Sequence, residues 1–340
     1  MKTLLYTLFI LISLQCFGQS KLQKNLNHYR DSILDYGIVA LVDNGKQIET
    51  AQIGWASKNK PITIQNRFCI GSVTKMLTST LVLKLQEEKR LSINDSLHTY
   101  LPHHPFIDSN ITIKQLLNHT SGIKDVVVAD LMNKALLEPK FDFSDDYLLS
   151  LIDTVDFLKG EQYRYSNSNF LLLRKILEIA SDKPYSALLE EYIIKPLKLE
   201  NTFPYHSKGI SNLAHPMVNG QDFQDWPKIG VNKISVGIGN VVSDIYDLNR
   251  ILRAIFIEKT IINTSSLNQM KTFKSYKNNK IGLGVFQEQF GNKTLVGHTG
   301  RSISYICYAF VEESSGTSFV LINNNANDYF IDELIEVICD

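Results

Sequence analysis

Cysteine is scarce in this sequence, and neither sign of charge is in excess. Four cysteines occur among 340 residues, and 35 Lys and Arg balance 35 Asp and Glu. So few cysteines do not make a disulfide framework, and Cys69, Cys307 and Cys339 are expected to be buried free thiols. The sequence does not decide whether Cys69 and Cys307 form a disulfide bond. The zero net charge gives no reason to expect nucleic acid or an anionic membrane surface as a partner.

Long apolar runs are also lacking, apart from residues 4–14, which are too few to span a bilayer comfortably. This run follows the basic Lys2, and small residues stand at positions −3 and −1 relative to Gln19. We therefore interpret residues 1–18 as a signal peptide. It predicts an exported protein, periplasmic or secreted, with no stable membrane span after cleavage. An uncleaved anchor and a lipoprotein cut before Cys16 are the alternatives.

The pattern of apolar residues places strands near both ends of the chain and helices between them. Strands are predicted at residues 37–43, 46–53, 281–290, 293–297, 304–311 and 318–323, with Asn44-Gly45 as the first hairpin turn. Helices are predicted at residues 23–34, 72–89, 111–118, 170–180, 185–194, 243–257 and 329–338, with Ser243 as an N-cap.

These elements predict an α+β fold with one antiparallel sheet of about five or six strands. The first and last helices would cover one face of the sheet. Because repeats, low-complexity tracts and linkers rich in Pro or Ser are absent, the helical middle is an insertion and not a tethered module. We expect a sheet subdomain at residues 19–66 and 230–340 and a helical subdomain at residues 67–229.

Ser72 and Lys75 stand three residues apart at the start of a predicted helix. Residues at this spacing lie on one face of a helix, one turn apart. A serine hydroxyl is a poor nucleophile until a base lies within hydrogen-bond reach, and a partly desolvated lysine can be that base. Because S-x-x-K recurs by chance, a solvated helix face is the alternative for this pair.

A second cluster, Tyr165-Ser166-Asn167, precedes the helix predicted at residues 170–180. A tyrosine next to a cationic lysine can have its phenol pKa lowered toward working pH, and it can then move protons between the serine and the leaving group. Asn167 offers an amide that can bridge a substrate carbonyl and the lysine. A polar helix N-terminus with one buried tyrosine is the alternative.

A third cluster, His298-Thr299-Gly300-Arg301, follows the strand predicted at residues 293–297, which we expect at a sheet edge. A glycine there lets a substrate backbone come close. The backbone N–H of Arg301 can point, beside the N–H of Ser72, at a developing oxyanion. A strand-to-loop turn with an incidental histidine is the alternative.

The three clusters occur together in the order S-x-x-K, Y-x-N and H-x-G. In this combination the chain resembles the class C beta-lactamase-related family of serine hydrolases, which includes D-alanyl-D-alanine carboxypeptidases and esterases. Further segments that resemble the family are RFCIG at residues 67–71, LLNHTSGI at 116–123, the glycine and SDxxDL of 237–248, and GLG at 282–284. The resemblance covers nearly all of the chain after residue 18 and implies a beta-lactamase/transpeptidase-like fold.

The resemblance also implies a mechanism. Ser72 would attack a carbonyl and form an acyl-enzyme, while Lys75 and Tyr165 would share the proton transfers; which of the two is the acylation base stays open. The residues expected to bind substrate are Asn167, His298, Thr299, Gly300 and Arg301, with the backbone N–H groups of Ser72 and Arg301 as the oxyanion hole. No metal or cofactor is needed. We expect His119 to brace its own loop, and His103-His104 to be solvated.

His298 stands where many relatives carry a lysine that attracts the substrate's carboxylate. A histidine with an ordinary pKa of about 6.5 is largely neutral at pH 7, so we expect weaker recognition of penicillins and similar acids unless Arg301 or Arg164 compensates.

The expected function is hydrolysis of a small-molecule or peptide substrate by a D-Ala-D-Ala-type peptidase or an esterase. A true beta-lactamase is the first alternative, and a non-catalytic binder of penicillin or cell-wall peptide is the second. An α/β-hydrolase is set aside because no G-x-S-x-G elbow is present. The sequence predicts no oligomeric state.

Overall fold

The computed structural model describes residues 19–33, 35–126, 128–138, 140–205, 210–224, 234–277, 279–302, 304–325 and 331–339. The predicted signal peptide, residues 1–18, lies outside these ranges and stays a prediction. Within the ranges, every helix falls short of the length and apolar character that a bilayer crossing needs. Cys69, Cys307 and Cys339 are buried free thiols, as expected.

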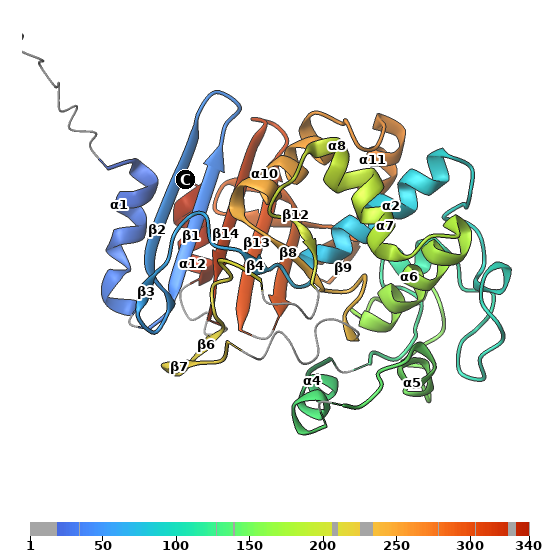
Figure 1. Cartoon of the computed structure of the whole chain (residues 1–340). Coiled ribbons are helices and arrows are strands. Elements are labelled where there is room, and N and C mark those ends of the chain that lie inside the picture. Colours follow the sequence, from blue (N-terminus) through green and yellow to red (C-terminus); the bar gives the residue numbers. More distant parts are fainter. Residues whose placement is uncertain are drawn as a thin grey trace, which may run out of the picture.

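One antiparallel sheet runs through the molecule (Figure 1). In spatial order its strands are β3 (Lys60–Pro61), β2 (Ile48–Ser57), β1 (Gly37–Asp43), β14 (Thr317–Asn323), β13 (Tyr305–Glu312), β12 (Lys293–Ser302), β11 (Phe286–Phe290), β10 (Asn279–Ile281) and β9 (Lys274–Tyr276). The predicted hairpin forms β1 and β2, and β1 also pairs with β14 in the register Ile38↔Asn323. Segments far apart in the sequence therefore meet at the centre of the sheet.

The expectation of five or six strands was wrong, because the described residues form nine in this sheet. Short strands extend both margins, and the run at residues 281–290 divides into β10 and β11. Gly284 lies between them with φ +67, a conformation that suits glycine and interrupts a strand. The bend packs on helix α2 (Val73–Glu87), because Ser79 Oγ donates to Leu283 O at 2.6 Å.

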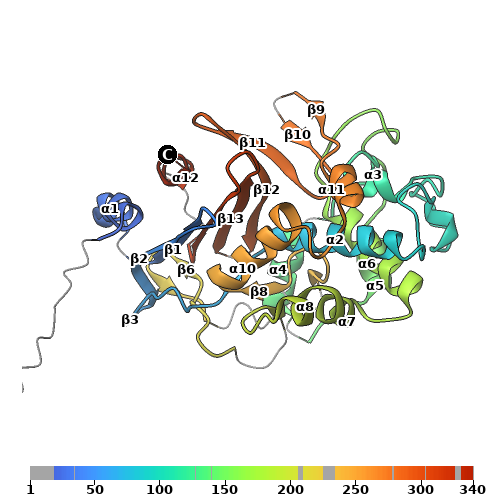
Figure 2. The ribbon, with the colours of Figure 1, turned by 90° about the horizontal axis from the view of Figure 1, so that it is seen from above.

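Helices cover both faces of the sheet (Figure 2). As predicted, the first and last helices share one face: α1 (Lys21–His28), continued by a 3₁₀ turn at Arg30–Ser32, and α12 (Ile331–Cys339). Leu26 and Leu334 bury their side chains there in one cluster with Ile38 and Leu321. A larger apolar cluster, which includes Val39 and Val320, fills the opposite side of the sheet.

The remaining helices belong to that opposite side. They are α2 (Val73–Glu87), α3 (Ile113–Leu117), α4 (Val128–Leu137), α5 (Asp145–Ser150), α6 (Asn167–Ser181), α7 (Tyr185–Leu189), α8 (Lys195–Leu197), α10 (Ile245–Leu252) and α11 (Thr264–Met270), with π-helical turns at Glu190–Ile194 and Arg253–Ile257 and a 3₁₀ turn at Leu97–Thr99. Small sheets join β4 (Phe68–Cys69), β8 (Val241–Ser243) and β5 (Phe203–Pro204), and β6 (Met217–Val218) with β7 (Gln221–Asp222). The division into two subdomains stays a prediction.

The N-cap predicted for α10 was wrong by one residue. Ser243 belongs to β8, where it pairs with Phe68 of β4. The cap is Asp244, whose carboxylate accepts from the backbone N–H of Asp247 at 2.8 Å. Because Ser243 pairs within β8, the N-cap moves one residue along the chain to Asp244. Aspartate is as favoured an N-cap as serine.

Helix α2 lies at the centre of the molecule. Twelve of its 15 residues are buried, and it contacts α6, α7, α11, β12 and β13. Seven of the 15 side chains in VTKMLTSTLVLKLQE are apolar, and buried Thr and Ser hydroxyls among the rest donate to backbone carbonyls. Ser72, at the N-cap position, and Lys75, in the first turn, are thereby placed where the sheet meets the helices.

Candidate active site

Ser72 and Lys75 contact each other at the N-terminal end of α2. Lys75 Nζ lies 3.0 Å from Ser72 Oγ and also 3.0 Å from the carbonyl oxygen of Ile238. Ser72 is half-buried, whereas the Lys75 side chain is fully buried. The pair that the S-x-x-K spacing predicted is thus within hydrogen-bond reach, and one partner remains accessible.

Burial sets the protonation of Lys75. Desolvation disfavours the ammonium form and lowers its pKa from 10.5 to about 7, although the nearby Asp125 carboxylate acts in the opposite direction. The rings of Tyr165 and Phe170 lie 5.0 and 5.6 Å from the ammonium nitrogen and replace water around it. At neutral pH a large fraction of Lys75 is therefore unprotonated and able to accept the Ser72 proton.

The backbone of Arg301 lies beside the residue that precedes Ser72. Within the described parts of the chain, the Ser72 N–H forms no hydrogen bond with the backbone or a side chain. The Arg301 backbone passes close to Gly71, because a Cβ added to Gly71 would lie 2.8 Å from Arg301 N. Gly71 adopts φ +53, and its lack of a side chain permits this approach. The oxyanion hole formed by the amides of Ser72 and Arg301 stays a prediction, and the closeness of the two backbone segments is compatible with it.

The glycine of the third cluster packs against the chain's own backbone, because a Cβ at Gly300 would lie only 2.0 Å from Ile70 O. The expected approach of a substrate backbone to Gly300 stays a prediction. The cluster also lies within a strand and not in a turn after it, since β12 continues to Ser302. β11 pairs with β12 only as far as Gly297, so His298 and the residues after it extend past that neighbour.

The prediction that the Tyr165 pKa is lowered was wrong. Burial of the hydroxyl raises the pKa of Tyr165 above its ordinary 10.0, and a nearby Ser72 hydroxyl offsets only part of that effect. The Tyr165 oxygen forms no hydrogen bond of ordinary geometry with a described residue. The phenol stays protonated at working pH, so it can donate a hydrogen bond near Ser72 but does not supply a phenolate.

Asn167 lies at the start of α6 and does not bridge to the lysine as expected. Its Nδ2 donates to Asp125 Oδ2 at 3.2 Å, and its backbone N–H donates to Asp125 Oδ1. Sequence reasoning missed Asp125, whose carboxylate caps α6 from 42 residues away. A lone aspartate after the LLNHTSGI segment carries no local signal for this contact. Burial raises the pKa of Asp125, while the Asn167 donors and Lys75 act to lower it.

His119 supports the tyrosine segment. Its ring stacks on the Tyr165 ring with centroids 4.4 Å apart, and its Nδ1 accepts from the backbone N–H of Ser166 at 3.2 Å. Burial, with Lys75 and His298 nearby, lowers the His119 pKa well below 6.5. The neutral imidazole therefore contacts both the ring of Tyr165 and the backbone that follows it.

His298 is neutral throughout the working range of pH. Its side chain is buried, and desolvation together with the Lys75 charge lowers its pKa to about 3. Nδ1 contacts Thr299 O, while the buried Nε2 has no hydrogen-bond partner among the described residues. Phe286, which sequence reasoning missed, packs edge-on against the His298 ring at 4.8 Å. The site therefore lacks the fixed cation that a lysine would supply there.

Relatives with known names match half of the chain or more. The family model described as Beta-lactamase matches residues 35–333. Protein flp of Staphylococcus aureus (strain MW2) is 24% identical over 331 residues, which cover 88% of this chain and 61% of that protein. The putative penicillin-binding protein PbpX of Bacillus subtilis (strain 168) is 30% identical over 179 residues, 51% of this chain and 42% of that protein. The chain thus spans at most about three fifths of these curated relatives.

Solved structures with a similar fold include two amide hydrolases. A D-stereospecific amidohydrolase from Streptomyces sp. has a TM-score of 0.80 at 25% identity, covering 94% of this chain and 97% of that chain. The D-amino acid amidase from Ochrobactrum anthropi SV3, complexed with L-phenylalanine, has a TM-score of 0.83 at 21% identity, covering 94% and 96%. Since the family match covers nearly the whole described fold, the chain belongs to the beta-lactamase family of serine hydrolases.

Proposed function

We propose that this protein is an exported serine hydrolase, a D-Ala-D-Ala-type peptidase or esterase, that forms an acyl-enzyme through Ser72. The observation that carries the proposal is the contact of 3.0 Å between Ser72 Oγ and the buried Lys75 Nζ, whose pKa is lowered to about 7. A lysine in this state accepts the serine proton without a third group. Tyr165, whose pKa is raised, is less suited to act as that base.

The reaction divides into two steps. Ser72 Oγ attacks the substrate carbonyl carbon while its proton passes to Lys75 Nζ, and the amides of Ser72 and Arg301 hold the oxyanion. Removing one such donor costs about 3–4 kcal/mol of transition-state stabilisation. The lysine then returns the proton to the departing amine or alcohol as the tetrahedral intermediate collapses to the acyl-enzyme. Water attacks the acyl carbonyl in the second step and restores Ser72.

The charge of the site supports amides and esters over penicillins. His298 is neutral and buried, so it offers no cation to the carboxylate that a beta-lactam carries. Arg301, which is exposed and belongs to the same strand as His298, and Arg164 are the candidates to compensate. The similarity to a D-stereospecific amidohydrolase and a D-amino acid amidase supports small amides of D-configured amino acids within the same substrate class.

A substrate panel tests the proposal. The mature chain and a Ser72→Ala variant are compared on a D-Ala-D-Ala peptide, a D-amino acid amide, a short-chain aryl ester and a chromogenic cephalosporin. We expect turnover of the ester and of at least one D-configured amide or peptide, with little turnover of the cephalosporin. The variant should lose this turnover, because Ser72 is the side chain whose hydroxyl contacts Lys75 Nζ among the described residues.

Intact-mass measurement after fluorophosphonate treatment identifies the nucleophile. One adduct on the parent chain and none on Ser72→Ala is expected. A Ser72→Ala variant that keeps full hydrolysis would remove Ser72 from this role. An adduct without turnover of any substrate would indicate the non-catalytic binder, and efficient cephalosporin turnover would indicate a beta-lactamase.

Export is tested separately. The expected result is a mature N-terminus at Gln19 when the protein is recovered from the periplasm or the medium of an expressing cell. Recovery in the cytoplasm with Met1 retained would contradict it.

A further inference from the structure

The second contact of Lys75 joins the site to an irregular segment of the chain. The Ile238 carbonyl that accepts from Lys75 Nζ lies in the segment before β8, outside any regular strand. Its turn is closed by the N–H groups of Ile238 and Gly239, which both donate to Ser235 O at 2.9 and 2.8 Å. The direction of the Ile238 carbonyl therefore depends on the side chains of other elements that contact this turn.

Thr78 holds the turn from α2. It stands three residues after Lys75 and so lies on the same helix face, one turn on. Its Oγ1 is 2.7 Å from Gly237 O, 2.7 Å from the Tyr185 hydroxyl and 3.2 Å from Thr74 O. A hydroxyl carries one hydrogen, and Gly237 O is the closest acceptor that has no hydrogen of its own. Thr78 therefore donates to Gly237 O, the residue directly before Ile238.

Tyr185 completes a directed chain of hydrogen bonds. Because Thr78 gives its hydrogen to Gly237 O, the Tyr185 hydroxyl donates to Thr78 Oγ1. Burial raises the pKa of Tyr185, so the phenol remains a donor at every working pH. The order is Tyr185 to Thr78 to the Gly237 carbonyl, and all three groups are buried.

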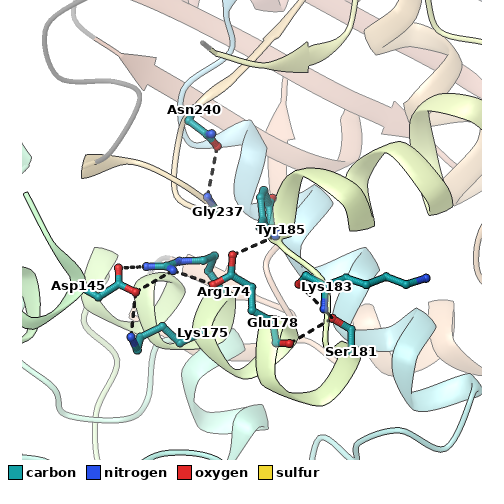
Figure 3. Close-up of polar contacts among 9 residues, drawn as sticks. All are labelled: Asp145, Arg174, Lys175, Glu178, Ser181, Lys183, Tyr185, Gly237 and Asn240. Carbon is teal, nitrogen blue, oxygen red and sulfur yellow. Dashed lines mark hydrogen bonds and ion pairs between the residues drawn. The ribbon is translucent and has the colours of Figure 1, made fainter. Parts of the chain in front are cut away.

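An ion-pair network anchors Tyr185 (Figure 3). Its backbone N–H donates to Glu178 Oε1 at 3.0 Å, and Glu178 pairs with Arg174 at 2.8 Å. Arg174 also binds Asp145, which takes Lys175 as a second partner at 2.8 Å. Three helices, α5, α6 and α7, are thereby joined around one buried guanidinium.

The same arginine supports the turn directly. A Cβ at Gly237, whose φ is +74, would lie 2.9 Å from Arg174 Cβ, so the turn rests on the arginine stem. Asn240 Oδ1 accepts from the Gly237 N–H at 3.3 Å (Figure 3). Gly237 is thus held on its carbonyl side by Thr78 and on its α-carbon side by Arg174.

We propose that Thr78 and Tyr185 are positioning residues, which hold the Gly237–Ile238 turn so that the Ile238 carbonyl keeps Lys75 Nζ beside Ser72. The proposal rests on the proposed function, in which Lys75 takes the serine proton. Neither residue touches the substrate, and both act through the turn.

The decisive variant is Thr78→Val, which keeps the side-chain shape and removes the hydroxyl. With the ester of the substrate panel, we expect kcat to fall about 10- to 100-fold, as a misplaced catalytic group does, while KM changes little. The acid limb of the pH profile should move to lower pH. In the parent, the Ile238 carbonyl accepts a hydrogen bond from the ammonium form of Lys75 and favours that form, and the variant loses this effect. Thr78→Ser keeps the donor and should restore kcat.

Thr80→Val is the matched control. Thr80 is buried on the same helix, and its Oγ1 donates to Met76 O at 2.8 Å without reaching the turn. It should keep kcat and the pH profile of the parent. Parent-like kcat in Thr78→Val, an equal loss in Thr78→Ser, or an equal loss in Thr80→Val would each overturn the positioning role.

Two further measurements keep the test decisive. If Thr78→Val does not fold, Tyr185→Phe replaces it, and a parent-like kcat and pH profile in that variant would overturn the proposal. Ser72→Ala is measured alongside. An inactive Ser72→Ala with a fully active Thr78→Val rejects only the positioning role, whereas an active Ser72→Ala rejects the proposed function itself.

Discussion

At the scale of single residues, the site depends on one buried amine. Lys75 sits where water is replaced by aromatic rings and a carbonyl, and its pKa falls to about 7 for that reason. The two histidines nearby are both neutral, since burial and the lysine charge lower the pKa of each. Of these three groups, Lys75 is the one whose pKa lies near neutral pH.

The dependence of activity on pH follows from this. A protonated Lys75 cannot accept the Ser72 proton, so kcat/KM should be low in acid, rise through a midpoint of about 7 and then level off. His298, with a pKa of about 3, should add no second step in the range where histidines usually titrate. The measurement is kcat/KM for an uncharged aryl ester between about pH 5 and 9, with spontaneous hydrolysis subtracted. A flat profile, or a midpoint near the ordinary lysine value, would contradict it.

The residues of the site were predictable to different degrees. Ser72 and Lys75 were predictable because one helical turn brings residues at this spacing together and because the two further clusters singled this pair out. The Asp125 contact with Asn167 was not predictable, since the two residues are 42 positions apart and Asp125 belongs to no motif. The sign of the Tyr165 pKa shift was also missed, because burial depends on tertiary packing and outweighs the neighbouring lysine.

At the scale of elements, the approach of β12 to the start of α2 depends on two glycines. Gly71 and Gly300 allow the backbones around Arg301 and Ile70 to come closer than any side chain permits. This contact sets the distance between the two amides of the candidate oxyanion hole.

A methyl group at this contact should separate the two elements. In Gly300→Ala, the new Cβ would lie 2.0 Å from Ile70 O and push β12 away. We expect kcat/KM to fall about 100-fold and the free energy of unfolding to fall by about 1–3 kcal/mol. Esterase assays and denaturant unfolding measure both. Gly316→Ala is the control, since a Cβ there meets nothing within 4 Å and only its φ of +70 is unfavourable. Parent activity in Gly300→Ala would contradict the expected effect.

The elements themselves were largely predictable where a period is strong. The apolar run of β1 and the 3.6-residue period of α2 gave correct types and nearly correct bounds. Errors arose where another segment decides the outcome. Gly284 bends the chain against α2 and divides one predicted strand, and Phe68 draws Ser243 into a strand instead of a cap.

At the scale of the whole molecule, Asn324 ties distant segments together. Its Oδ1 accepts from Gly37 N at 2.7 Å, and its Nδ2 donates to Trp55 O and His215 O at 3.2 and 2.8 Å. The side chain is fully buried. One amide therefore joins β1, β2 and the segment before β6 to the end of β14.

Removing that amide should weaken the whole fold. Asn324→Ala leaves several buried backbone groups without partners, so we expect the free energy of unfolding to fall by about 2–4 kcal/mol. Denaturant unfolding at fixed pH is the measurement. Asn110→Ala, at an exposed position, should stay within about 0.5 kcal/mol of the parent. Equal stability of the two variants would contradict the role given to Asn324.

The pairing of β1 with β14 has a consequence for when the protein can fold. Gly37 and Asn324 are 287 positions apart, so the partner of the first strand leaves the ribosome long after it. At a synthesis rate of about 5–20 residues per second, the interval is roughly 15 to 60 seconds. During that time the central sheet is incomplete, so the order of its strands delays completion of the fold until almost all of the chain has been made.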